Sequence, residues 1–197
     1  MPYEGTAIRS QDQRKGTTRL RRLVAAVVAS ESAPAAAAVS WLRNGAEELT
    51  LEAADAMANA ALAEARNRKF KDISVYVMDA TGRVLVSKTM LGCPRLIPSI
   101  AEAKAGAAVG THSSSRALKE KYVPERAPQL LAMTTIANAS RQPFCAVPGG
   151  VLVRHQSGNV LGAIGVSGAS ADEDEHCAIA GAHAVGLITE PAESALQ

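Results

Sequence analysis

The residues best suited to chemistry in this sequence are small residues that gather around two predicted strand ends. They are Pro148, Gly149 and Gly150 at one end, and Gly165, Ser167 and Gly168 at the other. Glycine allows positive φ angles and leaves room where another group must come near. We therefore expect either a ligand or a neighbouring subunit to lie against these two segments.

The spacing of the glycines argues against a dinucleotide site. Gly162, Gly165 and Gly168 are spaced G-x-x-G-x-x-G, whereas the dinucleotide fingerprint is G-x-G-x-x-G between a strand and a helix. The segment 167–170 precedes the acidic run 172–175, which indicates a loop that enters a helix. Capping of that helix is the alternative to ligand binding for this segment.

No arrangement of residues in the sequence predicts a catalytic centre, and we assign no catalytic residue. A G-x-S-x-G motif is absent. Asp79, Asp174 and Glu175 are candidate acids, although carboxylates at strand and helix ends are usually solvated or capping. Lys104 lies in an alanine-rich segment, where it either meets an anionic ligand or snorkels from a buried face to solvent.

Composition and charge exclude several classes of partner. The chain has 197 residues, with 21 Lys and Arg against 19 Asp and Glu, so no basic surface calls for nucleic acid. Only 3% of residues are aromatic, which leaves little for stacking on bases. The longest apolar run, Leu23–Ala29, is far shorter than the roughly 20 residues that span a bilayer. We expect no nucleic acid partner and no membrane span.

The elements that must position these residues follow from periodicity and turn signals. Thr50 caps a helix to about Arg68, and 73–79 with 84–89 form a hairpin around Gly82. Helices are predicted at 99–118, broken near 110–113, and at 128–138. Strands are predicted at 144–147, 151–155 and 160–166, and a last helix at 172–187. Consecutive hairpins favour an antiparallel sheet covered by helices, an α/β (α+β) fold of three layers.

The first 47 residues differ from the rest and form a predicted N-terminal extension to a domain at 48–197. Arginines precede the apolar run Leu23–Ala29, and small residues follow it. A secretory signal, an organellar transit peptide and a disordered tail all fit this outline. The compartment therefore stays open between cytoplasmic, exported and organellar.

Several ordered motifs make the chain resemble the GlcG/HbpS-like family over about residues 48–189. They are Pro148-Gly-Gly-Val151, Gly162-x-Ile-Gly-Val-Ser-Gly-Ala169 and Asp174-Glu175, preceded by Leu49-Thr-Leu51, Val77-Met-Asp79-x-x-Gly82, Met90-x-Gly92 and Ser99-Ile-Ala101-x-x-Lys104-Ala105. The resemblance implies a profilin-like α/β/α fold with a five-stranded antiparallel sheet. It also implies assembly into higher homo-oligomers, often octamers. Members are linked to haem binding, to glycolate-utilisation genes and to the C-terminal domain of PduO-type proteins.

The resemblance also points to a pocket between the middle helices. The family carries a Pro-Thr pair there, and alignment from Lys104-Ala105 places Ser114-Ser115 at that position, where Ser115 keeps a hydroxyl. The implied ligand-binding set is Lys104, His112, Ser115, Pro148, Gly149, Gly150, Gly165, Ser167 and Gly168. A tetrapyrrole metal, if bound, would have four histidines and three cysteines to choose from, and the ligand is left unknown.

Among those metal ligands, His112 is the best placed because it lies three residues before Ser115 in the same loop. His176 and His183 lie seven residues apart, two turns along one helix face, which is too far for one metal without a third ligand. Cys93-Pro94 resembles the dipeptide of haem-regulatory motifs, in which a thiolate binds iron.

Three functions remain open from the sequence. The first is a small-ligand-binding oligomeric module that takes haem, another tetrapyrrole or a small organic anion. The second is an auxiliary protein or enzyme of small 2-hydroxy-acid (glycolate) metabolism, with Asp79 or Asp174-Glu175 as general base. The third is an assembly subunit without a ligand, in which the glycines serve packing.

Overall fold

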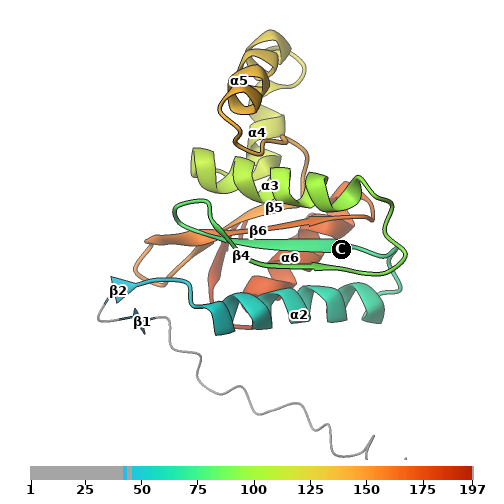
Figure 1. Cartoon of the computed structure of the whole chain (residues 1–197), viewed down its shortest axis with the longest axis vertical. Coiled ribbons are helices and arrows are strands. Elements are labelled where there is room, and N and C mark those ends of the chain that lie inside the picture. The colour runs from blue at the N-terminus through green and yellow to red at the C-terminus, as the bar shows by residue number, and fades with distance from the viewer. Residues whose placement is uncertain (1–41, 44–45, 197) are drawn as a thin grey trace, which may run out of the picture. The chain divides into compact units, whose positions relative to one another are not determined.

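Helix α2 (Leu51–Asn67) opens the domain where the sequence predicts it, in a computed structural model that describes residues 42–43 and 46–196 (Figure 1). The Thr50 hydroxyl accepts a hydrogen bond from the backbone N–H of Ala53 at 3.2 Å, which caps the first turn. Before the helix, strands β1 (Leu42–Arg43) and β2 (Ala46–Glu47) form a short antiparallel pair. The rest of the predicted N-terminal extension lies outside the described residues.

A five-stranded antiparallel sheet forms the middle layer. It consists of β3 (Ser74–Asp79), β4 (Val84–Thr89), β5 (Gly150–Arg154), β6 (Val160–Ser167) and β7 (Ile188–Glu190). The strand order is β4-β3-β6-β5-β7, so β6 lies at the centre. Its register sets Ser167 opposite Ser74 and Gly165 opposite Gly150.

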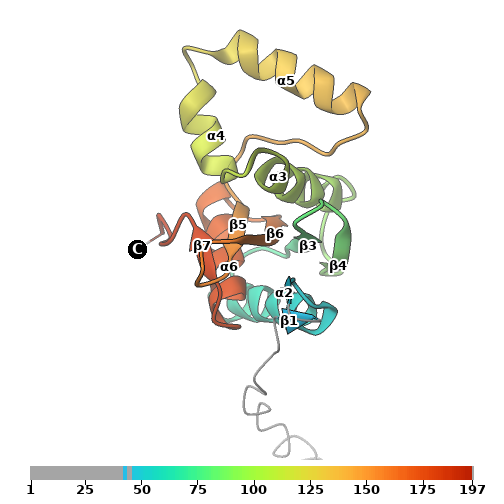
Figure 2. The same ribbon diagram turned by 90° about the vertical axis from the view of Figure 1, so that its left-hand side faces the viewer.

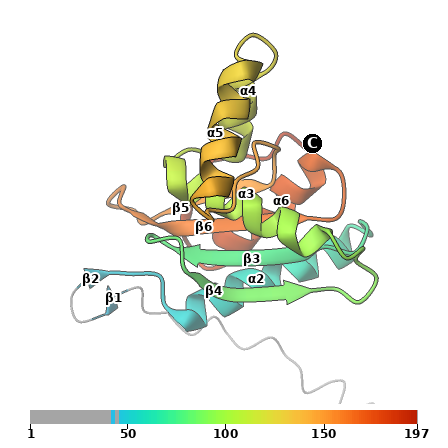
Figure 3. The ribbon, with the colours of Figure 1, turned by 45° about the horizontal axis from the view of Figure 1, so that its top comes forward.

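Helices cover both faces of this sheet. Helix α2 and helix α6 (Ala171–His183) lie on one face, and helix α3 (Ile97–Thr111) lies on the other (Figures 1 and 2). Helices α4 (Ser115–Tyr122) and α5 (Ala127–Ala139) stand beyond α3, away from the sheet (Figure 3). The three-layer α+β fold predicted from the sequence is confirmed. No helix in the described part of the chain is long and apolar enough to cross a membrane.

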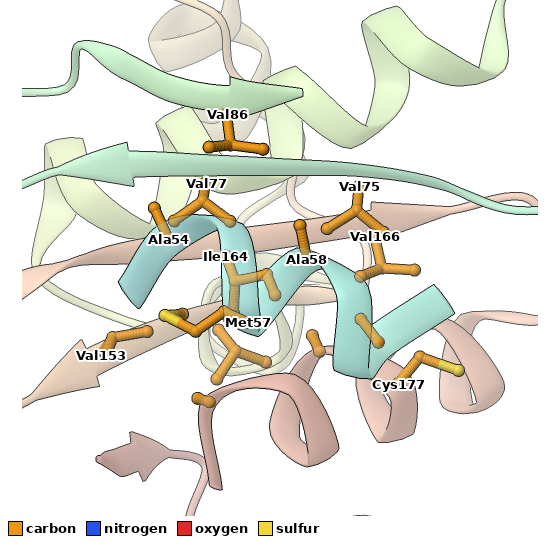
Figure 4. Packing of buried hydrophobic residues seen from close by; sticks show 14 of the residues in the cluster. Ala54, Met57, Ala58, Val75, Val77, Val86, Val153, Ile164, Val166 and Cys177 are labelled. Carbon is orange, nitrogen blue, oxygen red and sulfur yellow. The ribbon is translucent and has the colours of Figure 1, made fainter. Parts of the chain in front are cut away.

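The largest core lies between the sheet and the α2–α6 layer. Figure 4 shows Met57 and Ala58 of α2 meeting Ile164 of β6 and Cys177 of α6, all fully buried or nearly so. Alanines dominate the buried face of α2, so α6 can approach closely, and Gly181 of α6 faces the carbonyl of Met57. The close packing fixes where the first residues of α6 point.

Two element predictions are wrong, each for its own local reason. Segment 144–147 is not a strand, because it runs outside the sheet along α3, where the Cys145 N–H donates to Ala103 O at 3.0 Å. The fifth strand is β7 instead, at the edge beside β5. Helix α6 ends at His183 rather than at Leu187, because the chain turns at Gly186, whose φ is +78°.

Candidate functional site

The centre of the candidate site is a buried ion pair between α3 and α6. Lys104 Nζ donates to Asp174 Oδ2 at 2.8 Å and to the carbonyl of Val166 at 2.9 Å. The two side chains are only 2% and 3% exposed. Snorkelling of Lys104 to solvent, one of the two sequence-based alternatives, is therefore wrong, because the ammonium group points inward to a carboxylate.

Asp174 is also more enclosed than the sequence suggests. Its Oδ1 accepts the N–H of Ala169 at 2.9 Å, so the carboxylate secures the loop that leads from β6 into α6. Burial raises the pKa of the Asp174 carboxyl, while the charge of Lys104 and its hydrogen bonds oppose that rise. Of the two expected states of this carboxylate, solvation is wrong, and the bond from the Ala169 N–H fits capping.

Ser115 joins α4 to the first residue of β5. Its Oγ accepts from Gly150 N at 2.8 Å and donates to Gly150 O at 3.2 Å, and the residue is fully buried. Ser114 precedes it as the N-cap of α4, accepting from Ala117 N at 3.2 Å. Both serines aligned with the family's pocket segment thus hold the start of α4 in place.

The glycines of the candidate site lie where separate segments of the chain pass close to one another. A Cβ on Gly165 would collide with the carbonyl of Ala101 in α3, and one on Gly149 would lie 2.8 Å from Lys104 Nζ. Gly149 also has φ +121°, which favours glycine. Gly150 meets the backbone of Lys104 and Gly168 meets that of Asp72. Pro148 and Ser167 are buried beside them.

A second ion cluster, which sequence reasoning missed, lies at the same end of α6. Arg116 of α4 donates from Nε to Glu175 Oε2 at 2.7 Å and also pairs with Asp172. Glu175 is fully buried, and within the described residues its Oε1 has no hydrogen-bond partner. Burial raises the pKa of Glu175, and Arg116 opposes the rise. Solvation, the usual state of such a carboxylate, is therefore also wrong for Glu175.

His112 lies at the corner between α3 and α4, next to the two serines. It ends α3 in a left-handed conformation with φ +50°, and its side chain is exposed. Among the described contacts, its imidazole makes no side-chain hydrogen bond. The other two histidines tested for a shared metal are engaged elsewhere, His176 with Glu64 at 2.8 Å and His183 with Thr189 at 3.0 Å.

The structure brings Lys104, Ser115, Gly149, Gly150 and Gly165 together around α3. His112 lies at the end of the same helix, apart from the buried pair. Nowhere in residues 42–43 and 46–196 do three or more ligating side chains cluster as a metal site would require. Cys93, Cys145 and Cys177 are free thiols, and burial raises the pKa of each of them.

Comparison with known proteins supplies the family context. Residues 49–183 match the family model described as "Haem degrading protein HbpS-like". A crystal structure of a double mutant of Streptomyces reticuli HbpS is 30% identical, with a TM-score of 0.59, and the match covers 79% of this chain and 98% of that chain. No curated protein matches this chain.

Two more distant structures share the fold. The PduOC:heme complex is 21% identical with a TM-score of 0.61, covering 71% of this chain and 96% of that one. Klebsiella pneumoniae protein ORFY is 22% identical with a TM-score of 0.61, covering 73% and 97%. At these identities the likeness concerns the fold alone.

Proposed function

This chain belongs to the HbpS-like family, and from that premise we propose that it is a small-ligand-binding module that assembles as a homo-oligomer and takes haem or another tetrapyrrole. The family description names haem degradation, and a protein of the same fold has been solved as a haem complex. Both support a tetrapyrrole over the other ligand classes that the sequence leaves open.

The observation that carries the proposal is the imidazole of His112, which is exposed at a helix corner and has no side-chain partner among the described contacts. Imidazole is a common protein ligand of haem iron. Lys104 and Ser115, in contrast, have their polar groups bonded within the protein. We therefore assign the iron contact to His112 and give Lys104 and Ser115 the role of holding the α3–α4 corner.

One cationic group near this corner suits the carboxylates of a tetrapyrrole. Exposed Lys119 lies in α4, seven residues after His112, whereas Arg116 is already paired with Glu175 and Asp172. Haem, when bound, would supply its iron, and the family description names haem degradation. The chain's own residues would ligate the iron through His112 and balance the propionate charge.

A haemin titration of the full chain tests this proposal. We expect a saturable Soret shift at micromolar haemin, and we expect His112→Ala to move the Soret maximum and weaken binding by about tenfold, or ~1.4 kcal/mol. His183→Ala is the matched control, because that imidazole is also exposed but is bonded to Thr189. Equal spectra for the two variants would remove His112 as the ligand. Absence of a saturable shift in the unmodified chain would remove haem.

A second candidate, an assembly subunit without a ligand, has one observation in its favour. The polar groups of Lys104 and Ser115, and the space at Gly149 and Gly150, are all taken up by the protein itself. A ligand that reached Lys104 would have to displace Asp174. A stable oligomer whose melting temperature is unchanged by haemin, protoporphyrin and glycolate would favour this candidate. The role in 2-hydroxy-acid metabolism stays a prediction.

A further inference from the structure

Helix α5 carries an apolar surface that nothing else in the described chain covers. Its 13 residues include no Asp, Glu, Lys or Arg. Three positions along one stripe, Leu130, Met133 and Ala137, are half-buried, and the other positions are exposed. Leu131 and Ile136 are 69% and 66% exposed.

The two threonines of α5 use their hydroxyl hydrogens within the helix. The hydroxyl of Thr134 donates to Leu130 O at 2.9 Å, and that of Thr135 donates to Leu131 O at 2.8 Å. Because both hydroxyls donate within the helix, they offer an outside partner only acceptor lone pairs beside their methyl groups. The exposed side of α5 is therefore uncharged and mostly apolar, with Leu131, Ala132 and Ile136 exposed alongside the amide side chains of Gln129 and Asn138.

A helix that is apolar all round is normally buried, and a large exposed apolar patch on a soluble protein marks an interaction site. An amphipathic helix that lies on a membrane carries Lys and Arg on its polar face. Since α5 has no such residues, a lipid surface is the poorer match. The surface fits a protein partner whose contact area is also uncharged and apolar.

We propose that α5 pairs in antiparallel orientation with α5 of a second copy of this chain. An uncharged surface can meet its own copy without repulsion between like charges, as a two-fold symmetric interface requires. The inference deepens the proposed homo-oligomer by naming its contact surface, and in that respect it rests on the proposed function.

Charge complementarity at the helix ends supports the antiparallel orientation. Exposed Glu125 lies two residues before α5, and exposed Arg141 lies two residues after it. When two copies of a helix about 20 Å long run antiparallel, Glu125 of each copy comes beside Arg141 of the other. Arg126 next to Glu125 has the opposite sign, so the pairing depends on Glu125 itself reaching Arg141.

One helix pair supplies only part of a standard interface, which buries about 800 Å² on each partner. Val123, which precedes the turn into α5, and Val147, which follows it in the chain, are 44% and 43% exposed. They lie four residues before α5 and eight residues after it in the sequence.

The first test removes the apolar contact. We expect Leu131→Glu and Ile136→Glu, measured in the full chain by sedimentation without haemin, to raise the dissociation constant of self-association by about tenfold or more. Leu91→Glu is the matched control, because that leucine is fully exposed but lies between β4 and α3. If the α5 variants and the control sediment alike, the assigned surface is wrong.

The second test exchanges the charges at the helix ends. Glu125→Arg and Arg141→Glu should each weaken self-association by about tenfold, because each sets like charges against each other twice. A mixture of the two variants should associate as the unmodified chain does, because both pairs then carry opposite charges. A mixture no stronger than the separate variants would overturn the antiparallel pairing. Lys119→Glu, on α4, controls for charge change alone.

The results of these two tests can contradict the α5 pairing without contradicting haem binding. Circular dichroism of each variant tests folding, and all four substituted positions are exposed, so the fold should persist. An unmodified chain that is monomeric, including one that instead binds lipid vesicles, overturns the inference. Haemin binding is then judged by its own titration. An oligomer unaffected by the α5 variants overturns the inference alone.

Discussion

Asp79 closes the turn between β3 and β4 with both of its carboxylate oxygens. Oδ1 accepts hydrogen bonds from the Thr81 N–H at 2.9 Å, the Thr81 hydroxyl at 2.6 Å and the Arg83 N–H at 3.1 Å, and Oδ2 accepts from Arg83 Nε at 2.8 Å. Burial alone would raise the pKa of Asp79, but these bonds outweigh it and lower the pKa below its usual value. The Asp79 carboxylate is therefore engaged in holding this turn, and its role as a general base stays a prediction.

This arrangement predicts a pH-dependent contribution to stability. A carboxyl whose pKa is lower in the folded state stabilises the fold above its unfolded pKa, and that stability is lost as pH falls through the folded pKa. We expect Asp79→Asn to cost about 1–2 kcal/mol at neutral pH. The difference between the two proteins in urea unfolding should shrink as pH falls below the usual range of Asp. A difference that is constant with pH would contradict this reading.

Lys104 and Asp174 should behave as a unit. Lys104→Met leaves a buried carboxylate without its cation, so we expect a loss of about 3–5 kcal/mol in the free energy of unfolding. The double variant Lys104→Met, Asp174→Asn removes the unpaired charge and should recover much of that loss. Urea titration of the three proteins gives the coupling energy, and additive losses would show that the two residues act independently.

The ion pairs were the least predictable part of the candidate site. Lys104 and Asp174 lie 70 positions apart, and Arg116 and Glu175 lie 59 apart. No local spacing connects such residues, so their pairing depends on the packing of α3, α4 and α6. The Thr50 cap and the turn at Gly82, in contrast, depend on neighbours in the sequence, and both were predictable.

At the scale of elements, β6 and α3 depend on glycine where they touch. A Cβ on Gly165 would lie 2.6 Å from Ala105 N and would also strike the carbonyl of Ala101. Gly165→Ala should therefore cost about 1–3 kcal/mol or more. Gly110→Ala is the matched control in α3, where an added Cβ meets nothing within 4 Å. That variant should be neutral or stabilised by up to about 1 kcal/mol. Thermal melts that rank the two variants the other way would contradict the packing.

Three glycines of the candidate site, Gly150, Gly165 and Gly168, show how much of the packing between elements can be predicted from the sequence. They predict a close approach, and the approaching groups in this structure are the backbones of α3 and residues 72–73. Sequence patterns identified most strands and helices because each has its own periodicity. They missed β7 because three residues, Ile188–Glu190, are too few to show alternation. Phe144–Val147 has strand-like composition but runs along α3 instead of joining the sheet.

For the whole molecule, the main core draws its described members from Leu49 to Leu187. We expect a chain that begins at Glu48 to fold with a melting temperature within about 2 °C of the full chain, because terminal residues contribute little unless they are packed. Scanning calorimetry of the two chains checks this. A large drop would place residues 1–47 within the folded domain and would move its predicted boundary.

Because Cys177 is buried, the rate at which its thiol is alkylated would report how often the domain opens. The thiol is 0% exposed, and burial raises its pKa to about 12, whereas Cys93 and Cys145 are partly exposed. Because the thiolate is the nucleophile that attacks an alkylating reagent and must be reached by it, the partly exposed Cys93 and Cys145 should react first. Cys177 should be modified only when α2 and α6 separate. Mass spectrometry of the labelled protein over time would then give an opening rate without denaturant, and labelling of Cys177 at the rate of Cys93 would reveal a domain that opens continually.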